Sequence, residues 1–247
     1  MASSIRKAES MAAGELAQYI DHSILRPEMN REEIERYARE GVQWGVATIC
    51  ANPDALDIIA PIVQGTATGM SVVCDFPFGQ GTPSAKEFLA RAYCQRGDVT
   101  DLDLVINYGL VRSGNWEKAG LDIKAAIDVC RDHGVVSKVI IETDALIDEE
   151  IVQACEAVIL AGADYVKTST GFYTGGPTVG ASREVIQKIL KAVHGRIKVK
   201  ASGNVRERAL FLDLIDMGVD RIGLSYKSTA VALGAGERGP ESQSGAY

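Results

Sequence analysis

The sequence is poor in histidine and has no hydrophobic run long enough to cross a bilayer. It contains 247 residues and only three histidines, without HxH or HExxH spacing, so a catalytic metal centre is not expected. No apolar stretch approaches the roughly 20 residues that span a membrane. The opening residues, MASSIRKAES, lack the apolar centre of a signal peptide. We therefore expect a cytoplasmic protein with no metal and no membrane partner.

Paired cysteines and dense blocks of basic residues are also lacking. The five cysteines are odd in number, widely spaced and mostly set in apolar patterns, which indicates reduced core thiols rather than disulfides. The formal net charge is -7 and the pI is about 5.1, which argues against nucleic acid as a partner. The glycine-rich segments GTATG (65–69) and TGGPTVG (174–180) match neither GxGxxG nor GxxxxGK[ST], so we interpret them as ordinary connections.

Short strand patterns alternate with amphipathic helix patterns along the chain. We expect eight strands, at 20–25, 46–52, 69–76, 101–108, 137–143, 165–170, 196–202 and 221–225, each followed by a helix. Ser84 is expected to cap one helix, and Pro61 to kink or end another. Eight such units in about 250 residues predict a (β/α)8 TIM barrel, with a doubly wound sheet as the alternative.

The chain reads as one domain over residues 1–247, because no linker or shift in composition interrupts it. A short helix at 11–19 precedes the barrel, which we place at about 20–234. The small, polar segment 235–247 should form a flexible tail.

A lysine at the end of the sixth predicted strand needs a physical explanation. Burial of the Lys167 ammonium costs several kcal/mol unless it is paired or loses its proton, and a neutral amine is a nucleophile. Lys200 ends the next strand, about 4.8 Å away. At ~5 Å and a dielectric constant of ~20 the two ammoniums repel by about 3 kcal/mol. We therefore predict that one pKa falls by roughly two units, toward about 8.

Asp103, which we place at or near the mouth of the barrel on the fourth predicted strand, could hold the partner lysine as a cation or transfer protons through water. Structural interpretations of the same residues stay open. Lys167 could pair with Glu142 or Asp164 at a strand end, and Asp103 could cap a loop. Cys50 is expected to be a small buried side chain near the mouth of the barrel.

Four motifs in order carry a family resemblance: LDLVINYG (102–109), SKVIIET (137–143), KTSTGF (167–172) and VKASGNVR (199–206). Together they resemble the 2-deoxyribose-5-phosphate aldolases, class I enzymes with a (β/α)8 fold, over about 21–225. The resemblance implies a Schiff base on Lys167, a perturbing role for Lys200 and a proton relay through Asp103. It implies reversible cleavage of 2-deoxyribose 5-phosphate to acetaldehyde and glyceraldehyde 3-phosphate, without metal or organic cofactor.

The resemblance also implies a substrate-binding set and a homo-oligomer. Its members are Thr170 and either Asp21 or Ser23 as hydroxyl anchors, with backbone groups of Gly171, Gly203, Asn204, Ser225 and Tyr226 around the phosphate. Asn204 stands where the family has glycine, and Tyr226 where it has a small hydroxyl residue. Our hypothesis is that phosphate binding is weakened or rearranged, which would admit a non-phosphorylated aldehyde.

Three further possibilities stay open from the sequence. In some members of the family a terminal tyrosine on the tail assists proton transfer, so Tyr247 either has that role or has none. A phosphosugar isomerase or epimerase could use the same barrel with a carboxylate or cysteine base. A non-catalytic ligand-binding barrel is the third possibility.

Overall fold

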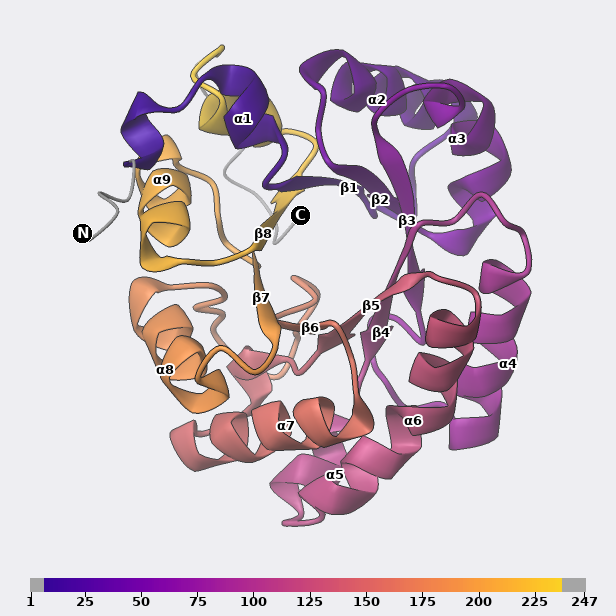
Figure 1. Cartoon of the computed structure of the whole chain (residues 1–247), viewed down its shortest axis with the longest axis vertical. Helices are drawn as coiled ribbons and strands as arrows, with labels where there is room; N and C mark the ends of the chain where they lie inside the picture. The colour runs from indigo at the N-terminus through magenta and orange to yellow at the C-terminus, as the bar shows by residue number, and fades with distance from the viewer. Residues whose placement is uncertain (1–6, 237–247) are drawn as a thin grey trace, which may run out of the picture.

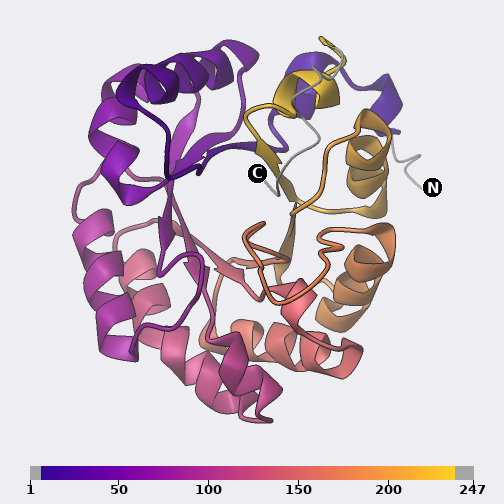
Figure 2. The same cartoon turned by 180° about the vertical axis from the view of Figure 1, so that it is seen from behind.

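The strands form a closed parallel barrel in the order in which they occur in the sequence. The computed structural model describes residues 7–236, and Figures 1 and 2 show its helices ringing the barrel when it is seen along its axis from either end. The strands are β1 (Ile20–Ile24), β2 (Thr48–Ala51), β3 (Gly69–Cys74), β4 (Asp101–Val105), β5 (Val136–Ile140), β6 (Tyr165–Lys167), β7 (Lys198–Ser202) and β8 (Arg221–Ser225). This confirms the predicted (β/α)8 fold.

Each strand is followed by a helix on the outside of the barrel. These helices are α2 (Arg31–Trp44), α3 (Leu56–Val63), α4 (Pro83–Cys94), α6 (Trp116–Asp132), α7 (Asp148–Ala161), α8 (Arg183–Val193), α9 (Arg208–Met217) and α10 (Thr229–Ala232). An extra helix, α5 (Tyr108–Arg112), precedes α6. Before β1, the chain forms a 3-10 turn (Ala8–Ser10) and the short helix α1 (Ala13–Ala17), close to the predicted N-terminal helix. Two further 3-10 turns are Pro53–Ala55 and Thr143–Ala145.

Several element boundaries differ from those predicted. The N-cap of α4 is Thr82, whose hydroxyl accepts a hydrogen bond from the Ala85 N–H at 3.3 Å, so the prediction of Ser84 was wrong. Pro83 then occupies the first turn, where a missing N–H is tolerated. Pro61 lies inside α3, which ends two residues later at Val63. The fourth strand stops at Val105 because the Asn107 side chain caps α5.

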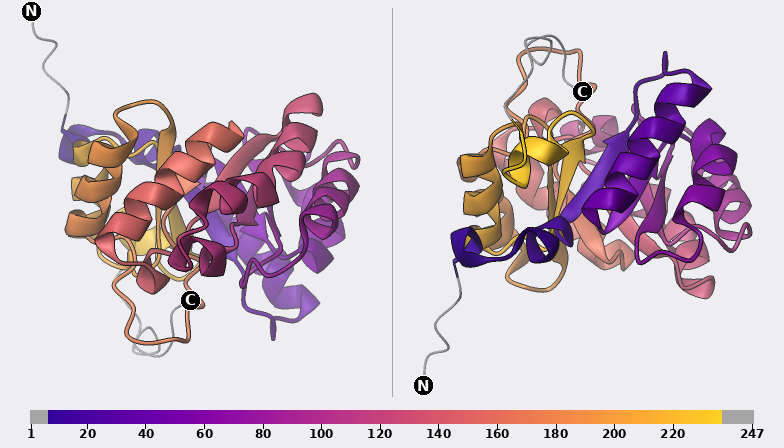
Figure 3. Two further views of the ribbon diagram at one scale, coloured as in Figure 1. Left: turned by 90° about the horizontal axis from the view of Figure 1, so that it is seen from below. Right: turned by 90° about the horizontal axis from the view of Figure 1, so that it is seen from above.

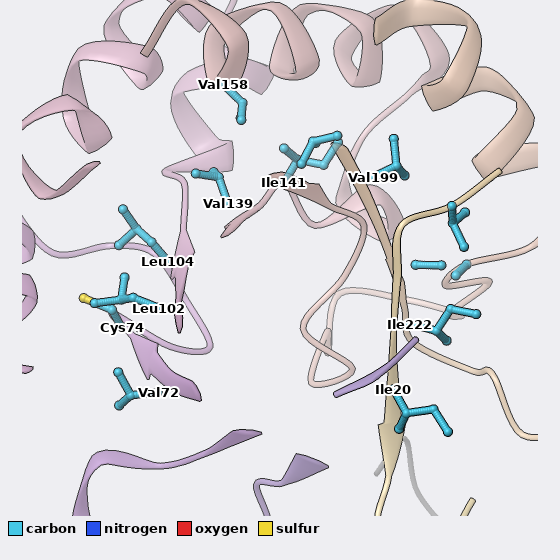
Figure 4. Packing of buried hydrophobic residues seen from close by; sticks show 14 of the residues in the cluster. Ile20, Val72, Cys74, Leu102, Leu104, Val139, Ile141, Val158, Val199 and Ile222 are labelled. Carbon is cyan, nitrogen blue, oxygen red and sulfur yellow. The ribbon is translucent and has the colours of Figure 1, made fainter. Parts of the chain in front are cut away.

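Apolar and charged side chains alternate along the strands. Leu102 and Leu104 of β4 point outward and are at most 1% exposed, and they join the apolar layer between strands and helices that Figure 4 shows. Asp101 and Asp103 occupy the intervening positions and face the barrel interior, because successive side chains of a strand point to opposite faces. The hydrophobic core therefore lies outside the barrel, between strands and helices, and the interior of the barrel contains charged side chains.

None of the helices described between residues 7 and 236 is both long enough and apolar enough to cross a membrane.

Candidate active site

Charged side chains from six of the eight strands meet inside the barrel. The cluster consists of Asp21 on β1, Asp101 and Asp103 on β4, Lys138 on β5, Lys167 on β6, Lys200 on β7 and Arg221 on β8. Four cations thus face three carboxylates. Each cation lies within 4 Å of at least one carboxylate, as buried charges require.

Lys167 and Lys200 are directly opposite each other in the β6–β7 register, and both donate to the same oxygen atom. The Nζ of Lys167 lies 2.7 Å from Oδ2 of Asp103, and the Nζ of Lys200 lies 2.6 Å from it. All three side chains are at most 1% exposed. The structure therefore brings together the three residues predicted to carry the chemistry, with the carboxylate between the amines.

The carboxylates reverse the predicted direction of the lysine pKa shift. Burial lowers the pKa of Lys167, but the Asp103 carboxylate, with smaller contributions from Cys50 and Asp21, outweighs that effect, and the resulting pKa is raised. Lys200 behaves in the same way: burial lowers its pKa, Asp103 and Asp21 raise it, and the repulsion from Lys167 is a smaller contribution. The prediction of a lowered pKa in the resting site was therefore wrong, because it considered only the two ammoniums.

Both carboxylate oxygens of Asp21 accept hydrogen bonds from protein side chains. Its Oδ2 accepts from Lys200 at 2.5 Å and Lys138 at 3.0 Å, and its Oδ1 from Thr48 at 2.7 Å and Arg221 at 2.9 Å. Burial raises the pKa of this carboxyl, but the three cations hold it well below its usual range. In this arrangement Asp21 binds the lysines rather than a substrate hydroxyl.

Lys138 belongs to the cluster and was missed from the sequence. Its Nζ lies 2.6 Å from Asp101, 3.0 Å from Asp21 and 3.6 Å from Asp103. The strand pattern SKVIIET contained the signal, because Val139 and Ile141 point outward and Lys138 must then face the interior. Arg221, which reaches Asp21 from β8, was also missed.

One side of the mouth is apolar. Leu25, Cys50 and Val73 are buried together, and Phe76 and Phe172 pack against them. The two phenylalanine rings meet each other edge to face, with centroids 5.4 Å apart. The Cys50 sulfur lies 4.0 Å from Oδ2 of Asp103, and burial raises the pKa of its thiol. Cys50 is therefore the small buried side chain that was expected.

The opposite side of the mouth holds a buried carboxyl. The Thr170 hydroxyl donates to Oε2 of Glu142 and accepts from the Phe172 N–H at 2.9 Å. Glu142 has a left-handed backbone, with φ = +56°, and its Oε1 has no hydrogen-bond partner among the described residues. Burial raises the pKa of Glu142, although its bonds to Thr170 oppose the shift. Glu142 thus positions Thr170, a role that the sequence did not indicate.

The predicted phosphate-binding residues lie at the ends of β6, β7 and β8. Gly171, Gly203 and Asn204 all have positive φ angles, of +82°, +91° and +57°, and so form tight turns after their strands. The hydroxyl of Ser225 is also at a strand end and accepts from the Lys227 N–H at 3.3 Å. Loops after the seventh and eighth strands form the phosphate site in many barrels of this type.

Two predicted binding residues are engaged within the fold. The N–H of Tyr226 donates to the carbonyl of Ser23 at 3.1 Å, and its ring packs against the Tyr37 ring, tilted by 42° with centroids 4.0 Å apart. The hydroxyl of Ser23 donates to the Asp21 carbonyl at 3.4 Å. The Tyr226 ring is therefore held against α2, and the Tyr226 N–H is already used.

Tyr247 lies outside the described residues. Within 7–236 no group of three or more histidine, cysteine, aspartate or glutamate side chains is arranged to hold a metal ion.

The chain has curated and structural relatives. A deoxyribose-phosphate aldolase from Desulfitobacterium hafniense is 40% identical over 213 residues, which cover 85% of this chain and 94% of the relative. Among solved structures, the aldolase QR15 has a TM-score of 0.79 at 32% identity, covering 88% of this chain and 94% of its own. The tetrameric deoxyribose phosphate aldolase of Aeropyrum pernix has a TM-score of 0.80 at 25% identity, covering 91% and 92%. No family model matches the chain.

These likenesses extend over nearly the whole barrel and confirm the resemblance that the four motifs indicated. This chain belongs to the deoxyribose-phosphate aldolase family of aldehyde-lyases.

Proposed function

We propose that this protein cleaves 2-deoxyribose 5-phosphate reversibly to acetaldehyde and glyceraldehyde 3-phosphate through a Schiff base on Lys167. The observation that carries the proposal is the single Asp103 oxygen shared by Lys167 and Lys200. An amine nucleophile beside a second cation and a carboxylate has a route by which to lose its proton, and the carboxylate can pass that proton to water.

The first step joins the substrate to the enzyme. Lys167 releases a proton by way of Asp103, and its Nζ attacks C1 of the open-chain aldehyde while the C=O electron pair moves to oxygen. Protonation of that oxygen gives the carbinolamine. Loss of water then gives the iminium ion, and Asp103 is placed to transfer the protons in both stages because it contacts the Nζ at 2.7 Å.

The second step breaks the C2–C3 bond. A base takes the proton of the C3 hydroxyl, the C2–C3 electron pair forms the C1=C2 enamine, and the iminium nitrogen accepts the displaced electrons. Glyceraldehyde 3-phosphate leaves, C2 of the enamine takes a proton, and water hydrolyses the imine to release acetaldehyde. Lys200 keeps a positive charge beside Asp103 throughout, which holds that carboxylate in place.

The substrate-binding roles follow the same placement. In this proposal the Thr170 hydroxyl, oriented by Glu142, faces the substrate hydroxyls, and the turns at Gly171 and Gly203–Asn204 hold the phosphate. Backbone N–H groups that point into a tight turn bind anions well. At the end of β8 the Tyr226 N–H is bonded to Ser23, so the Ser225 hydroxyl, which can still donate its own proton, is the group that we assign to the phosphate there.

We also infer a cytoplasmic homo-oligomer. All five cysteines are free and buried, which fits a reducing compartment. The tetrameric relative from Aeropyrum pernix supports assembly from several copies.

Borohydride reduction tests the Schiff base. Incubation with acetaldehyde and sodium borohydride should add one ethyl group at Lys167, which peptide mass spectrometry would locate. The Lys167→Leu variant should form no adduct and show no cleavage. Lys198→Leu is the matched control, because Lys198 lies on β7 two residues before Lys200 but is exposed. A wild-type protein without an adduct, or an active Lys167→Leu variant, would contradict the proposal and favour an isomerase or epimerase.

A further inference from the structure

The loop between β6 and α8 is attached to both neighbouring strand ends. Its segment 173–181, here called the rim loop, projects from one end of the barrel in Figure 3. On one side, the Asp144 carboxylate accepts from the N–H groups of Val179 and Gly180, at 2.6 and 3.0 Å. On the other side, the rim loop contacts the turn after β7.

The second attachment depends on the Asn204 side chain. Its Nδ2 donates to the carbonyl oxygen of Thr178 at 3.0 Å and to the Thr178 hydroxyl at 3.1 Å. The backbone of Asn204 is left-handed, a conformation that asparagine tolerates better than most residues. The Oδ1 of Asn204 accepts from Nη2 of Arg206 at 3.4 Å, so the amide nitrogen is committed to the rim loop and the amide oxygen to the segment after β7.

The rim loop in turn fixes a peptide group of the proposed phosphate site. The N–H of Ala181 donates to the carbonyl of Gly203 at 3.0 Å, and a Cβ at Gly180 would collide with that carbonyl. In a trans peptide the N–H points opposite to the C=O. With the Gly203 carbonyl held toward Ala181, the Asn204 N–H must point away from the rim loop.

We propose that Asn204 is a positioning residue for the phosphate end of the substrate. Its side chain holds Thr178, the rim loop stays against the end of β7, and the Gly203–Asn204 peptide keeps its N–H directed for the anion. Asn204 thereby maintains selectivity for the 5-phosphate ester. This reverses our sequence-based hypothesis, and it rests on the proposed aldolase function.

The test compares 2-deoxyribose 5-phosphate with 2-deoxyribose as substrates of Asn204→Gly. Glycine keeps the left-handed backbone but removes both bonds to Thr178, together with the longer bond from Arg206. The ratio of kcat/KM for the ester to kcat/KM for the free sugar should fall about tenfold, and the loss should lie in KM for the ester. His194→Gly is the matched control: His194 is exposed, has φ = +48°, and caps the C-terminal end of α8, before β7 begins rather than after it ends.

Thr178→Val shows whether Asn204 acts through the rim loop. It removes the hydroxyl acceptor and leaves the carbonyl, so the ratio should fall by about threefold. The double variant should match Asn204→Gly, because residues that act through one contact are not additive. Additive losses, an unchanged or lower KM for the ester in Asn204→Gly, or equal losses for both substrates would overturn the proposal.

Hydrogen exchange separates this inference from the aldolase assignment. The amides of 178–181 should exchange faster in Asn204→Gly than in wild type or His194→Gly, whatever reaction the enzyme performs. Unchanged exchange would contradict the attachment itself. A missing borohydride adduct on wild-type Lys167 would instead contradict the aldolase function and leave the exchange result standing.

Discussion

Two fully buried lysines show how differently this fold uses a charged amine. Lys86 lies on α4, outside the barrel, where its Nζ contacts the Asp122 carboxylate, Asp75 at 3.5 Å and the Gly79 carbonyl at 3.0 Å. Lys167 lies inside the barrel, where it shares its carboxylate oxygen with Lys200. The exposed fractions are 0% and 1%, so burial does not distinguish them.

The difference lies in the ratio of cations to acceptors. Lys86 has two carboxylates and a carbonyl around one ammonium, an arrangement that ties α4 and α6 to the loop after β3. In the barrel, four cations compete for three carboxylates. The first arrangement fixes a loop in place, whereas the second sets two amines on one carboxylate oxygen, so that Asp103 can pass a proton to or from either of them.

Removal of Asp103, the carboxylate that Lys167 and Lys200 share, should have the largest effect on activity. In Asp103→Asn, kcat should fall by about 10²–10⁴, the range expected for loss of a proton-transfer group. The Lys167 pKa should fall as well, because Asp103 is the main group that raises it against burial. Borohydride trapping of acetaldehyde should therefore extend to lower pH even as turnover drops. A trapping profile that moves to higher pH would show that Asp103 does not set this pKa.

Replacement of each lysine by methionine should separate stability from activity. Lys86→Met leaves Asp122 and Asp75 without their ammonium and should lower the free energy of unfolding by about 3–5 kcal/mol. Lys167→Met leaves Asp103 with Lys200 and Lys138, so the loss should be about 1 kcal/mol or less. Urea denaturation measures both values.

The lysine comparison has a control and a contrary outcome. The double variant Lys86→Met, Asp122→Leu should recover part of the lost stability, because it removes one of the stranded carboxylates. Equal losses of unfolding free energy in Lys86→Met and Lys167→Met would contradict the proposed difference between the two lysines.

A buried group that stays neutral should give the smallest effect. His22 has a pKa lowered to about 4, because burial outweighs a backbone hydrogen bond that raises it. Below pH 6.5 the unfolded chain takes up a proton that the folded chain takes up only near pH 4, so stability falls as pH falls. The loss attributable to His22 should reach about 3 kcal/mol near pH 4.

The His22 effect is a difference in slope rather than in absolute stability. The free energy of unfolding should decline less between pH 7 and pH 4 in His22→Gln than in wild type. Gln64→Asn, an exposed substitution that changes no ionisable group, should keep the wild-type slope. Parallel slopes for wild type and His22→Gln would contradict the neutral, buried state of this ring.

The fold and the three principal side chains were predictable because they depend on local patterns. Alternation of strand and helix indicates the barrel, and the position of Lys167, Lys200 and Asp103 near strand ends places them at one face. The inward direction of Lys138 was available from the alternation along β5 but was missed, whereas the direction of the lysine pKa shifts was not predictable from β6 and β7 alone. That direction depends on carboxylates from strands distant in sequence, because Asp21 of β1 contacts Lys200 of β7 at 2.5 Å and Lys138 of β5 at 3.0 Å.

The Asn204 and Tyr226 side chains show a second limit of the sequence. Their size suggested obstruction of the phosphate site, but each contacts a different element, Asn204 the rim loop and Tyr226 the Tyr37 ring. A larger side chain can point away from a binding site when a neighbouring loop or helix provides a contact for it. The residue type alone does not indicate which way the side chain points.

The direct pairing of Lys167 with Lys200 in the strand register has an evolutionary consequence. A one-residue insertion in β6 or β7 would turn one amine outward into the apolar layer, because side chains alternate between the two faces. The strands must therefore keep their lengths, whereas the rim loop can lose or gain residues without moving either amine. Descendants of this enzyme could change the substrates they accept by altering loops while inheriting the same bond-breaking step.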